Sequence, residues 1–317
     1  MTWLVWRQHR NQVYFAAAAL GAFAVLLLVT GLQMASQYHS ALASCAANGS
    51  CGNLADTLHL GSPVLFALVS LTIAVPGLLG VFWGGPLVAR ELETGTSQFV
   101  WMQSVTRRHW LTVKTGSALL AAAAWGGAVT ALVTWWSSPQ NALELNTFEP
   151  GHFDVQGVVP IGYAVFAVAL GITAGTLIRR TVPALAVTAG LFASLRIAIT
   201  YFVRPHFMHP LTATFNPAHP TLPAGAAWQL TQGTINPAGQ TLPGGARLYI
   251  PSGCRNLAGL GTDKVMSCMG EHGYRAFITF QPANRYWTFQ GIETAIFLAL
   301  ASVLVATTAI VLLHRDA

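Results

Sequence analysis

The chain has 317 residues, of which 53% are hydrophobic and 8% are charged, and its formal net charge at pH 7 is +6. Soluble domains carry about 25% charged residues, so this composition excludes a water-soluble globular protein and indicates that lipid covers the surface. The Lys and Arg residues flank the apolar runs, where anionic lipid head groups account for them. The positive charge therefore does not indicate a nucleic-acid partner.

Six continuous apolar runs are long enough to cross a bilayer as helices, because hydrocarbon about 30 Å thick needs roughly 20 residues. They cover residues 13–34, 63–84, 115–137, 157–178, 183–203 and 288–313. Such runs differ from the alternating segments of about 10 residues that build transmembrane β-barrels. We therefore expect an all-α membrane protein with six transmembrane helices. Its richness in Ala, Gly, Val and Thr is typical of a bacterial protein, so the expected location is the plasma membrane, the bacterial inner membrane.

The runs divide the chain into three expected parts. Residues 1–203 hold an N-terminal interfacial segment and five spans, with a coupling loop at 85–114. Residues 204–287 form a large loop subdomain between spans five and six, and residues 288–317 hold the sixth span and a tail. The 204–287 loop is rich in Pro, Gly and aromatic residues, so irregular structure with a short helix or two is expected there.

The distribution of Lys and Arg predicts the orientation. With six spans both termini share one side, and that side holds Arg7, Arg10, Arg90, Arg107, Arg108, Lys114, Arg179, Arg180 and Arg315. The short loops on the opposite side, 35–62 and 138–156, contain no Lys or Arg. By the positive-inside rule both termini are cytoplasmic and the 204–287 loop is extracellular. The first run lacks a cleavage site and is interpreted as an uncleaved signal-anchor.

All four cysteines fall on the outer side, which is oxidising. The simplest pairing is local, Cys45 with Cys51 and Cys254 with Cys268. Closing a loop of about 15 residues stabilises a fold by on the order of 3 kcal/mol. Pairing between the two loops also fits the sequence. Zinc is the rival interpretation, although neither pair has tight C-x-x-C spacing.

Glycines mark two helix contacts. Gly80 with Gly84, and Gly171 with Gly175, have G-x-x-x-G spacing, which we interpret as packing seams between membrane helices. Pro76 near the middle of the second run permits a kink.

Charged residues concentrate between the second and third runs, in ARELETGTSQFVWMQSVTRRHWLTVK at 89–114. Gly95 is expected to end the helix of the second span, and Thr96 to cap a short helix over Ser97–Gln103. Ser104 or Thr106 is expected to cap the helix of the third span. The short helix would expose Phe99, Val100, Trp101 and Met102, and exposed aromatic residues indicate a protein partner.

This segment resembles the cytoplasmic loop of ABC-2 type permeases, the membrane subunits of ATP-binding-cassette exporters. In that loop E-R-E-x-G-T is followed by a hydrophobic stretch, then by T-P-x-S-R and a basic residue. The first part is matched by Arg90, Glu91, Glu93, Gly95 and Thr96, and the second by Val105, Thr106, Arg107 and Lys114. Ser104 stands where the family often has proline. The six-span topology extends the resemblance to the whole chain, which also looks like the ABCG-type exporters.

The resemblance implies a dimer of permeases, expected to be a homodimer, with two ATP-binding cassette subunits that each hold one coupling helix in a cleft. The residues expected at this contact are Glu91, Glu93, Gly95, Thr96, Phe99, Trp101, Arg107 and Arg108. The chain has no G-x-x-x-x-G-K-[ST] phosphate loop, so it is not expected to be an enzyme by itself. ATP and Mg²⁺ are expected on the partner subunit. The alternative interpretation of Glu91, Glu93, Arg107 and Arg108 is that their charges only solvate the loop and fix the membrane topology.

The resemblance also implies that substrate passes along the dimer axis between spans two and five. The residues that these spans offer are Phe66, Pro76, Phe82, Phe192, Arg196 and Tyr201. This lining suits outward movement of an amphipathic, lipid-like or drug-like molecule. Ordinary helix packing is the alternative interpretation of each apolar residue.

Arg196 lies about 10 Å from the outer end of span five at 1.5 Å per residue, and Glu293 lies at similar depth in span six. A charge facing lipid costs roughly 2–3 kcal/mol on insertion scales. We therefore expect the two residues to pair inside the bundle, either as a structural clasp or as part of an outer gate. The alternative is that Arg196 extends outward to the interface.

Other functions compete with export. His206, Met208 and His209, with Met266 and Met269 near Cys268, suggest a soft-metal site and hence a metal-handling membrane protein. A membrane-embedded hydrolase is disfavoured because the spans hold almost no ionisable residues beyond Arg196 and Glu293. A non-exporting ABC-type sensor or resistance complex would share the features of an exporter.

Overall fold

The computed structural model describes residues 2–48, 63–95, 106–138, 141, 148, 150–219, 226–242, 250–256 and 261–314. Among these residues, six helices are long and apolar enough to cross a membrane, so the prediction of six spans is confirmed and the chain is a multi-pass membrane protein. They are Ala17–Ala46, Ala67–Glu93, Arg107–Trp136, Val159–Ile178, Thr181–His206 and Ala283–Leu313. The predicted coupling helix over Ser97–Gln103 lies outside the described residues.

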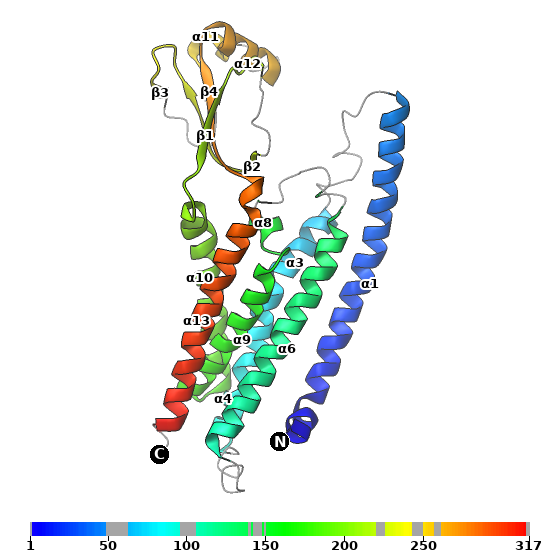
Figure 1. Ribbon diagram of the computed structural model, residues 1–317, viewed down its shortest axis with the longest axis vertical. Coiled ribbons are helices and arrows are strands. Elements are labelled where there is room, and N and C mark those ends of the chain that lie inside the picture. Colours follow the sequence, from blue (N-terminus) through cyan, green and yellow to red (C-terminus); the bar gives the residue numbers. More distant parts are fainter. Residues whose placement is uncertain are drawn as a thin grey trace. The chain divides into compact units, whose positions relative to one another are not determined.

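The chain forms two compact units. The first contains Met1–Leu143, Pro150–Thr200 and Gln290–Ala317, and the second contains Glu144–Glu149 and Tyr201–Phe289. The helices of the first unit are α1 (Thr2–Asn48), α3 (Pro63–Leu79), the π-helical turn η1 (Gly80–Gly84), α4 (Gly85–Glu93), α6 (Arg107–Trp136), α8 (Pro150–Phe153), α9 (Val159–Ile178), α10 (Thr181–Ala198) and most of α13 (Tyr286–His314) (Figure 1). A second π-helical turn, η2 (Ile199–Val203), follows α10.

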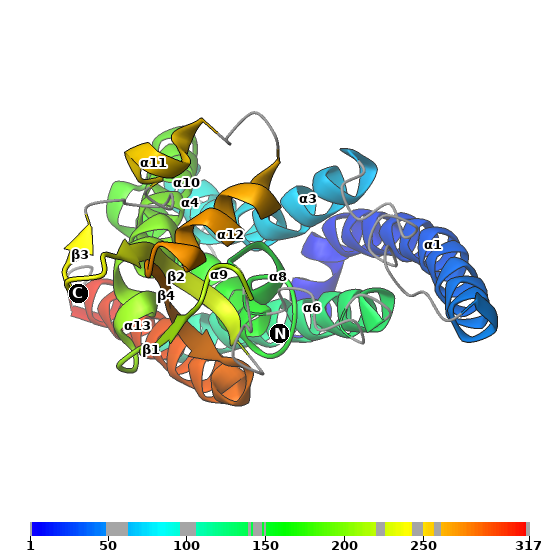
Figure 2. The ribbon, with the colours of Figure 1, turned by 90° about the horizontal axis from the view of Figure 1, so that it is seen from above.

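Helix α9 lies at the centre of the first unit and contacts α3, η1, α4, α6 and α10 (Figure 2). Small residues let the backbones approach closely there. A Cβ atom added at Gly171 would collide with the carbonyl oxygen of Gly80, and one added at Gly84 would lie 2.7 Å from the carbonyl oxygen of Val168. The two predicted G-x-x-x-G seams therefore pack against each other, as is usual for close membrane helices.

Helix α1 packs mainly along α6. Leu27 of α1 is buried in a cluster with Val129 and Val133 of α6. Nearby, the indole nitrogen of Trp136 donates a hydrogen bond to the hydroxyl of Thr30 at 3.0 Å. Beyond this contact much of α1 is exposed, with Val29 and Leu32 among its exposed apolar side chains. Such a surface suits contact with lipid tails.

The second unit contains a four-stranded antiparallel sheet, so the expectation of an all-α chain with an irregular 204–287 loop is wrong in this part. The strands are β1 (Leu211–Phe215), β2 (Ala226–Ile235), β3 (Thr241–Leu242) and β4 (Arg275–Pro282), in the order β1-β4-β2-β3. On β4 the side chains of Ala276, Ile278 and Phe280 are buried and alternate with more exposed ones, which is the period of a half-buried strand. Short 3₁₀ turns at Arg204–His206 and Ala283–Arg285 flank the sheet in sequence.

Two short helices complete the second unit, α11 (Ser252–Arg255) and α12 (Thr262–Glu271). The predicted Cys254–Cys268 disulfide joins them, which confirms that pairing. Cys254 packs with Val265 and Met269 in a small apolar cluster. The predicted partner of Cys45, Cys51, lies outside the described residues.

Candidate functional site

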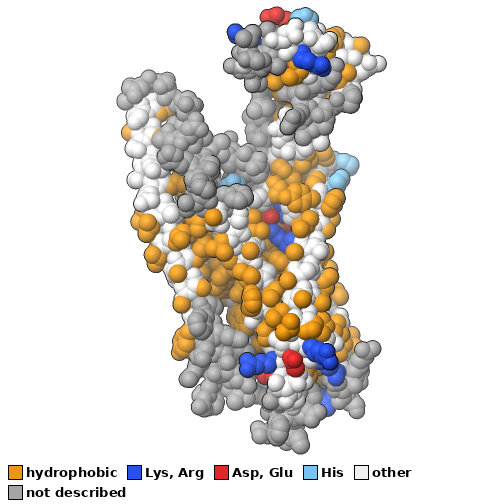
Figure 3. All heavy atoms as spheres, turned by 180° about the vertical axis from the view of Figure 1, so that it is seen from behind, with side chains coloured by type: hydrophobic (Ala, Val, Ile, Leu, Met, Phe, Trp, Pro, Cys, Tyr) orange, Lys and Arg blue, Asp and Glu red, His pale blue; other side chains and the backbone are white. Residues whose placement is uncertain are grey.

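A cluster of buried charged side chains lies within the helices of the first unit. Asp154 directly follows α8, Tyr163 belongs to α9, Arg196 to α10 and Glu293 to α13. The relative exposure is 7% for Arg196 and 0% for Glu293. Seen from one side, the helices are covered by hydrophobic side chains, with a small patch of acidic and basic groups between them (Figure 3). Charges are rare at such positions in membrane helices, so this cluster is a candidate functional site.

Arg196 is the centre of this cluster. Its Nη2 atom lies 2.9 Å from Oδ2 of Asp154 and donates a hydrogen bond to it, whereas its Nη1 atom lies 4.0 Å from Oε1 of Glu293. The structure thus brings together the two residues predicted to pair, but the closer ion pair is with Asp154. The sequence predicts a connecting loop over 138–156, so it does not indicate Asp154 as a partner of Arg196.

Tyr163 joins both carboxylates to the arginine. Its hydroxyl lies 2.5 Å from Oε1 of Glu293 and 3.3 Å from Oδ1 of Asp154, and its ring faces the guanidinium of Arg196. The cluster links the end of α8 with α9, α10 and α13, so it fixes three candidate spans to one another. Breaking such a network strands a buried charge, which is costly in a medium of low dielectric constant.

Gln290 extends this polar region by one turn of α13. Its Oε1 atom accepts hydrogen bonds from the backbone nitrogens of Val158 at 3.0 Å and Val159 at 2.9 Å, at the start of α9. Its Nε2 atom donates to the carbonyl oxygens of Phe153 at 3.1 Å and Gln156 at 3.2 Å. One buried amide therefore satisfies four backbone groups at the turn between α8 and α9, including nitrogens at the start of α9 that have no partner within the helix. In the sequence, the signal for this polar region is the spacing of Gln290 and Glu293, three residues apart in an apolar helix.

The residues predicted to line a substrate pathway are distributed over several elements in the described part of the chain. Pro76 is buried in α3, and Phe192 packs against Gly77 of α3 and stacks on Phe166 of α9 with ring centroids 6.2 Å apart. Phe82 is exposed on η1. Tyr201 belongs to the second unit and is also exposed, and the side chain of Phe66 lies outside the description.

An apolar cavity of about 800 Å³ lies between α1, α3, η1 and α6. Alanines and large apolar side chains make up its lining: Ala17, Ala19, Leu20, Phe23, Leu71, Val75, Leu78, Leu79, Phe82, Trp83, Ala121, Ala124, Trp125 and Ala128. The volume is within the range of about 300–1,000 Å³ found for small-molecule sites. Phe82 is the one predicted pathway residue in this lining. With no charged group among the lining residues, the cavity suits an alkyl chain rather than an ion.

Polar contacts also gather where α4 ends and α6 begins. Helix α4 ends as predicted, since Gly95 has a φ of 70° shortly after its last residue, Glu93. Helix α6 begins as predicted, since the Thr106 side chain caps it by accepting a hydrogen bond from the backbone nitrogen of His109.

Two carboxylates at the end of α4 contact neighbouring helices. Glu91 forms an ion pair with Lys114 of α6, and Glu93 accepts two hydrogen bonds from Thr181 of α10. Arg107 and Arg108 begin α6, and Arg108 is exposed. Thr96, Phe99 and Trp101 lie outside the described residues.

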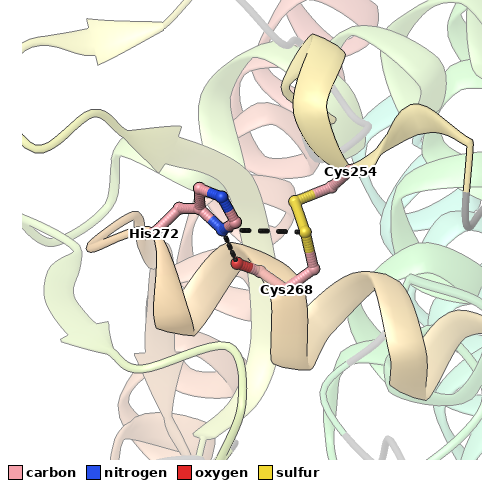
Figure 4. Close-up of side chains that lie close together, drawn as sticks. All are labelled: Cys254, Cys268 and His272. Atoms are coloured by element: carbon pink, nitrogen blue, oxygen red, sulfur yellow. Dashed lines mark hydrogen bonds between the residues drawn. A yellow bond between two sulfur atoms is a disulfide. The ribbon is translucent and has the colours of Figure 1, made fainter.

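The soft-metal interpretation centred on the second unit. In the described part of the chain, the Cys, His and carboxylate side chains close enough together to share a metal ion are Cys254, Cys268 and His272. Figure 4 shows that the two sulfurs are bonded to each other, and His272 directs its Nδ1 atom to the carbonyl oxygen of Cys268 at 2.8 Å. Metals bind thiolates, so the oxidised pair does not present the donors that such a site needs.

Comparison with known proteins identifies one relationship. The family model described as ABC-2 membrane transporter related matches residues 17–204, which is more than half of the chain. Comparison with curated proteins and with solved structures gave no match.

Proposed function

Because the chain belongs to the ABC-2 membrane transporter related family, and is thus a membrane subunit of an ABC-type transporter, we propose that it is the permease of an ATP-driven exporter. In this proposal it works as a homodimer with two separate ATP-binding subunits, which bind ATP and Mg²⁺. The cargo is an amphipathic, lipid-like or drug-like molecule that moves outward across the bacterial plasma membrane.

The observation that supports this cargo class is the apolar cavity between α1, α3, η1 and α6. Its lining is hydrophobic throughout, and the indoles of Trp83 and Trp125 offer flat apolar surfaces. A site of this kind binds an alkyl chain through burial of apolar area. Its lining residues carry no charged group to replace the hydration that a small hydrophilic ion would lose on entering. The permease itself needs no catalytic group, because the free energy comes from the partner.

The proposed orientation places both termini and the connection between α4 and α6 in the cytosol, and the sheet of the second unit outside. Support comes from the Lys and Arg of Arg107–Lys114 and from the lack of basic residues in 35–62 and 138–156. The coupling helix over Ser97–Gln103 then meets the ATP-binding subunit. Phe99 and Trp101 supply its apolar anchors, and Arg107 and Arg108 its charge complementarity.

The proposal is tested by purifying the chain from membranes together with an ATP-binding subunit and measuring ATP hydrolysis by the complex. Outward movement of a fluorescent phospholipid analogue in inside-out vesicles, dependent on ATP, is the expected result. Hydrolysis without movement of any amphipathic probe would favour a sensor or resistance complex. Purification without a nucleotide-hydrolysing partner would contradict the proposal.

Orientation is tested separately by cysteine accessibility. In whole cells, a membrane-impermeant maleimide is expected to label Thr212→Cys in β1, which is exposed, and to leave Ser97→Cys unlabelled until the cells are opened. The reverse pattern would overturn the proposed topology.

A further inference from the structure

The end of α4 is tied to α6 by an ion pair between Glu91, which is partly buried, and Lys114, which is buried. Lys114 has a relative exposure of 2% and lies about 10 Å along α6 from its first residue, Arg107. Its Nζ atom pairs with the carboxylate of Glu91, donates a hydrogen bond to the carbonyl oxygen of Leu87 at 3.2 Å and lies 5.0 Å from the ring centroid of Trp110. A lysine satisfied in this way is not available to a partner protein. It holds the third candidate span against the end of the second.

The same short helix is tied to α10 by a second carboxylate. The Oε2 atom of Glu93 accepts hydrogen bonds from the backbone nitrogen of Thr181 at 2.9 Å and from its hydroxyl at 2.6 Å. Thr181 is the first residue of α10, and a negative charge at a helix N-terminus is favourable because the exposed N–H groups carry partial positive charge. Residues two apart on a helix point in different directions, so Glu91 and Glu93 reach two different neighbours.

We propose that Glu91 and Glu93 are positioning residues that carry a displacement of the coupling segment, residues 94–106, into the third and fifth spans respectively. The inference rests on the proposed function, since a displacement is expected only if an ATP-binding subunit moves this segment. It assigns to these two carboxylates a task within the permease, in place of the expected pairing with the ATP-binding subunit. The segment leaves α4 immediately after Glu93 and enters α6 at Arg107, so both contacts lie at its base.

The experiment uses one reporter on each receiving helix. A spin label is placed at Leu120→Cys on α6 or at Leu191→Cys on α10, which are 74% and 53% exposed. The complex with its ATP-binding subunit is reconstituted in lipid, and the spectral change on adding ATP, Mg²⁺ and vanadate is recorded. Glu93→Ala and Thr181→Pro test the link to α10, and Glu91→Gln tests the link to α6. Arg90→Gln is the matched control, because Arg90 is an exposed charge on the same helix.

Thr181→Pro is a selective change. It removes both donors to Glu93, and proline is well tolerated at the first position of a helix. Arg180, which would precede the new proline, already has the extended conformation that proline requires, with ψ of 129°. The helix is therefore preserved while the contact is lost.

The expected result is a reciprocal pattern. Glu93→Ala and Thr181→Pro reduce the ATP-dependent change at Leu191→Cys by about fivefold or more, the lower end of typical coupling between sites, and spare Leu120→Cys. Glu91→Gln does the opposite, and Arg90→Gln changes neither. An unchanged response at the other reporter shows that each variant is folded. If the two carboxylates only stabilised the fold, a variant would reduce the response at both reporters.

Equal responses at both reporters in Glu93→Ala and Thr181→Pro would overturn the inference. Glu93 is exposed, so its variants decide the matter even if Glu91→Gln fails to assemble. Absence of any ATP response in the unaltered chain would instead overturn the proposed function, and the inference with it.

Discussion

The guanidinium carbon of Arg196 lies 3.4 Å from the centre of the Tyr163 ring. The cation is therefore stacked on the face of the same tyrosine whose hydroxyl contacts Glu293. A cation over an aromatic face gains roughly 2 kcal/mol or more when desolvated. Tyr163 thus supports the arginine through its ring and the carboxylate through its hydroxyl.

Arg196→Ala is expected to lower the stability of the purified protein by about 3–5 kcal/mol, because it leaves the carboxylates of Asp154 and Glu293 without the cation that they face. Tyr163→Phe keeps the ring and removes the hydroxyl, for an expected loss of about 1–3 kcal/mol. Thermal unfolding in a mild detergent measures both. Tyr201→Phe is the control, since Tyr201 is exposed. An Arg196→Ala protein as stable as the unaltered one would show that the cluster does not hold the helices together.

Gly171→Ala is expected to destabilise the first unit strongly. The added methyl group would collide with the carbonyl oxygen of Gly80, and backbone cannot move aside as a flexible side chain can. Overpacking of this kind costs about 1–3 kcal/mol and occasionally more. Gly190→Ala is the matched control, because no atom lies within 4 Å of its added Cβ and alanine favours a helix by about 1 kcal/mol. Membrane yield and thermal unfolding report the difference, and equal behaviour of the two variants would contradict the close approach of α9 and η1.

Ala124→Phe is expected to fill part of the apolar cavity and to lower photocrosslinking by a phospholipid with a photoactivatable acyl chain. The ring occupies space that the chain would otherwise take. Leu120→Phe is the control on the same helix, since Leu120 is highly exposed and does not line the cavity. Mass spectrometry of crosslinked peptides from α3 and α6 measures the change. Unaltered crosslinking in Ala124→Phe would mean that the chain binds elsewhere.

Reduction of the Cys254–Cys268 disulfide is expected to loosen α11 and α12. The cysteines are 14 residues apart, and closing a loop of this size contributes about 3 kcal/mol in the chain-entropy model. Limited proteolysis with and without dithiothreitol would show faster cleavage between them after reduction. The double variant Cys254→Ser with Cys268→Ser should already be cleaved rapidly and should not respond to the reductant. A reductant effect that persists in this variant would assign it to another disulfide.

Features determined by local sequence were predictable. The six spans follow from the length of each apolar run, the end of α4 from Gly95, and the start of α6 from Thr106. The Cys254–Cys268 bridge follows from the short distance between the two cysteines along the chain. Each depends on residues within a few turns of one another.

Features that depend on distant segments were not predictable in the same way. From the sequence, Lys114 is expected to be a basic residue at a membrane surface. In the structure it is buried because α4 packs beside α6. Asp154 reads as a loop residue until α8 and α10 bring it to Arg196. The sheet had a local signal in the alternation of Ala276, Ile278 and Phe280. However, β4 pairs with β1, and Leu211 of β1 lies opposite Phe280 of β4. Such pairing between distant segments cannot be predicted from the sequence of either segment alone.

The π-helical turn η1 has a consequence for the carboxylates below it. The backbone nitrogen of Gly85 bonds to the carbonyl oxygen of Gly80, five residues earlier, so this turn holds one residue more than an α-helical turn. One residue corresponds to about 100° of rotation about the helix axis. Were the second span α-helical throughout, α4 would be rotated by that angle, and Glu91 and Glu93 would face away from Lys114 and Thr181. The extra residue in η1 thus determines which face of α4 points toward α6 and α10.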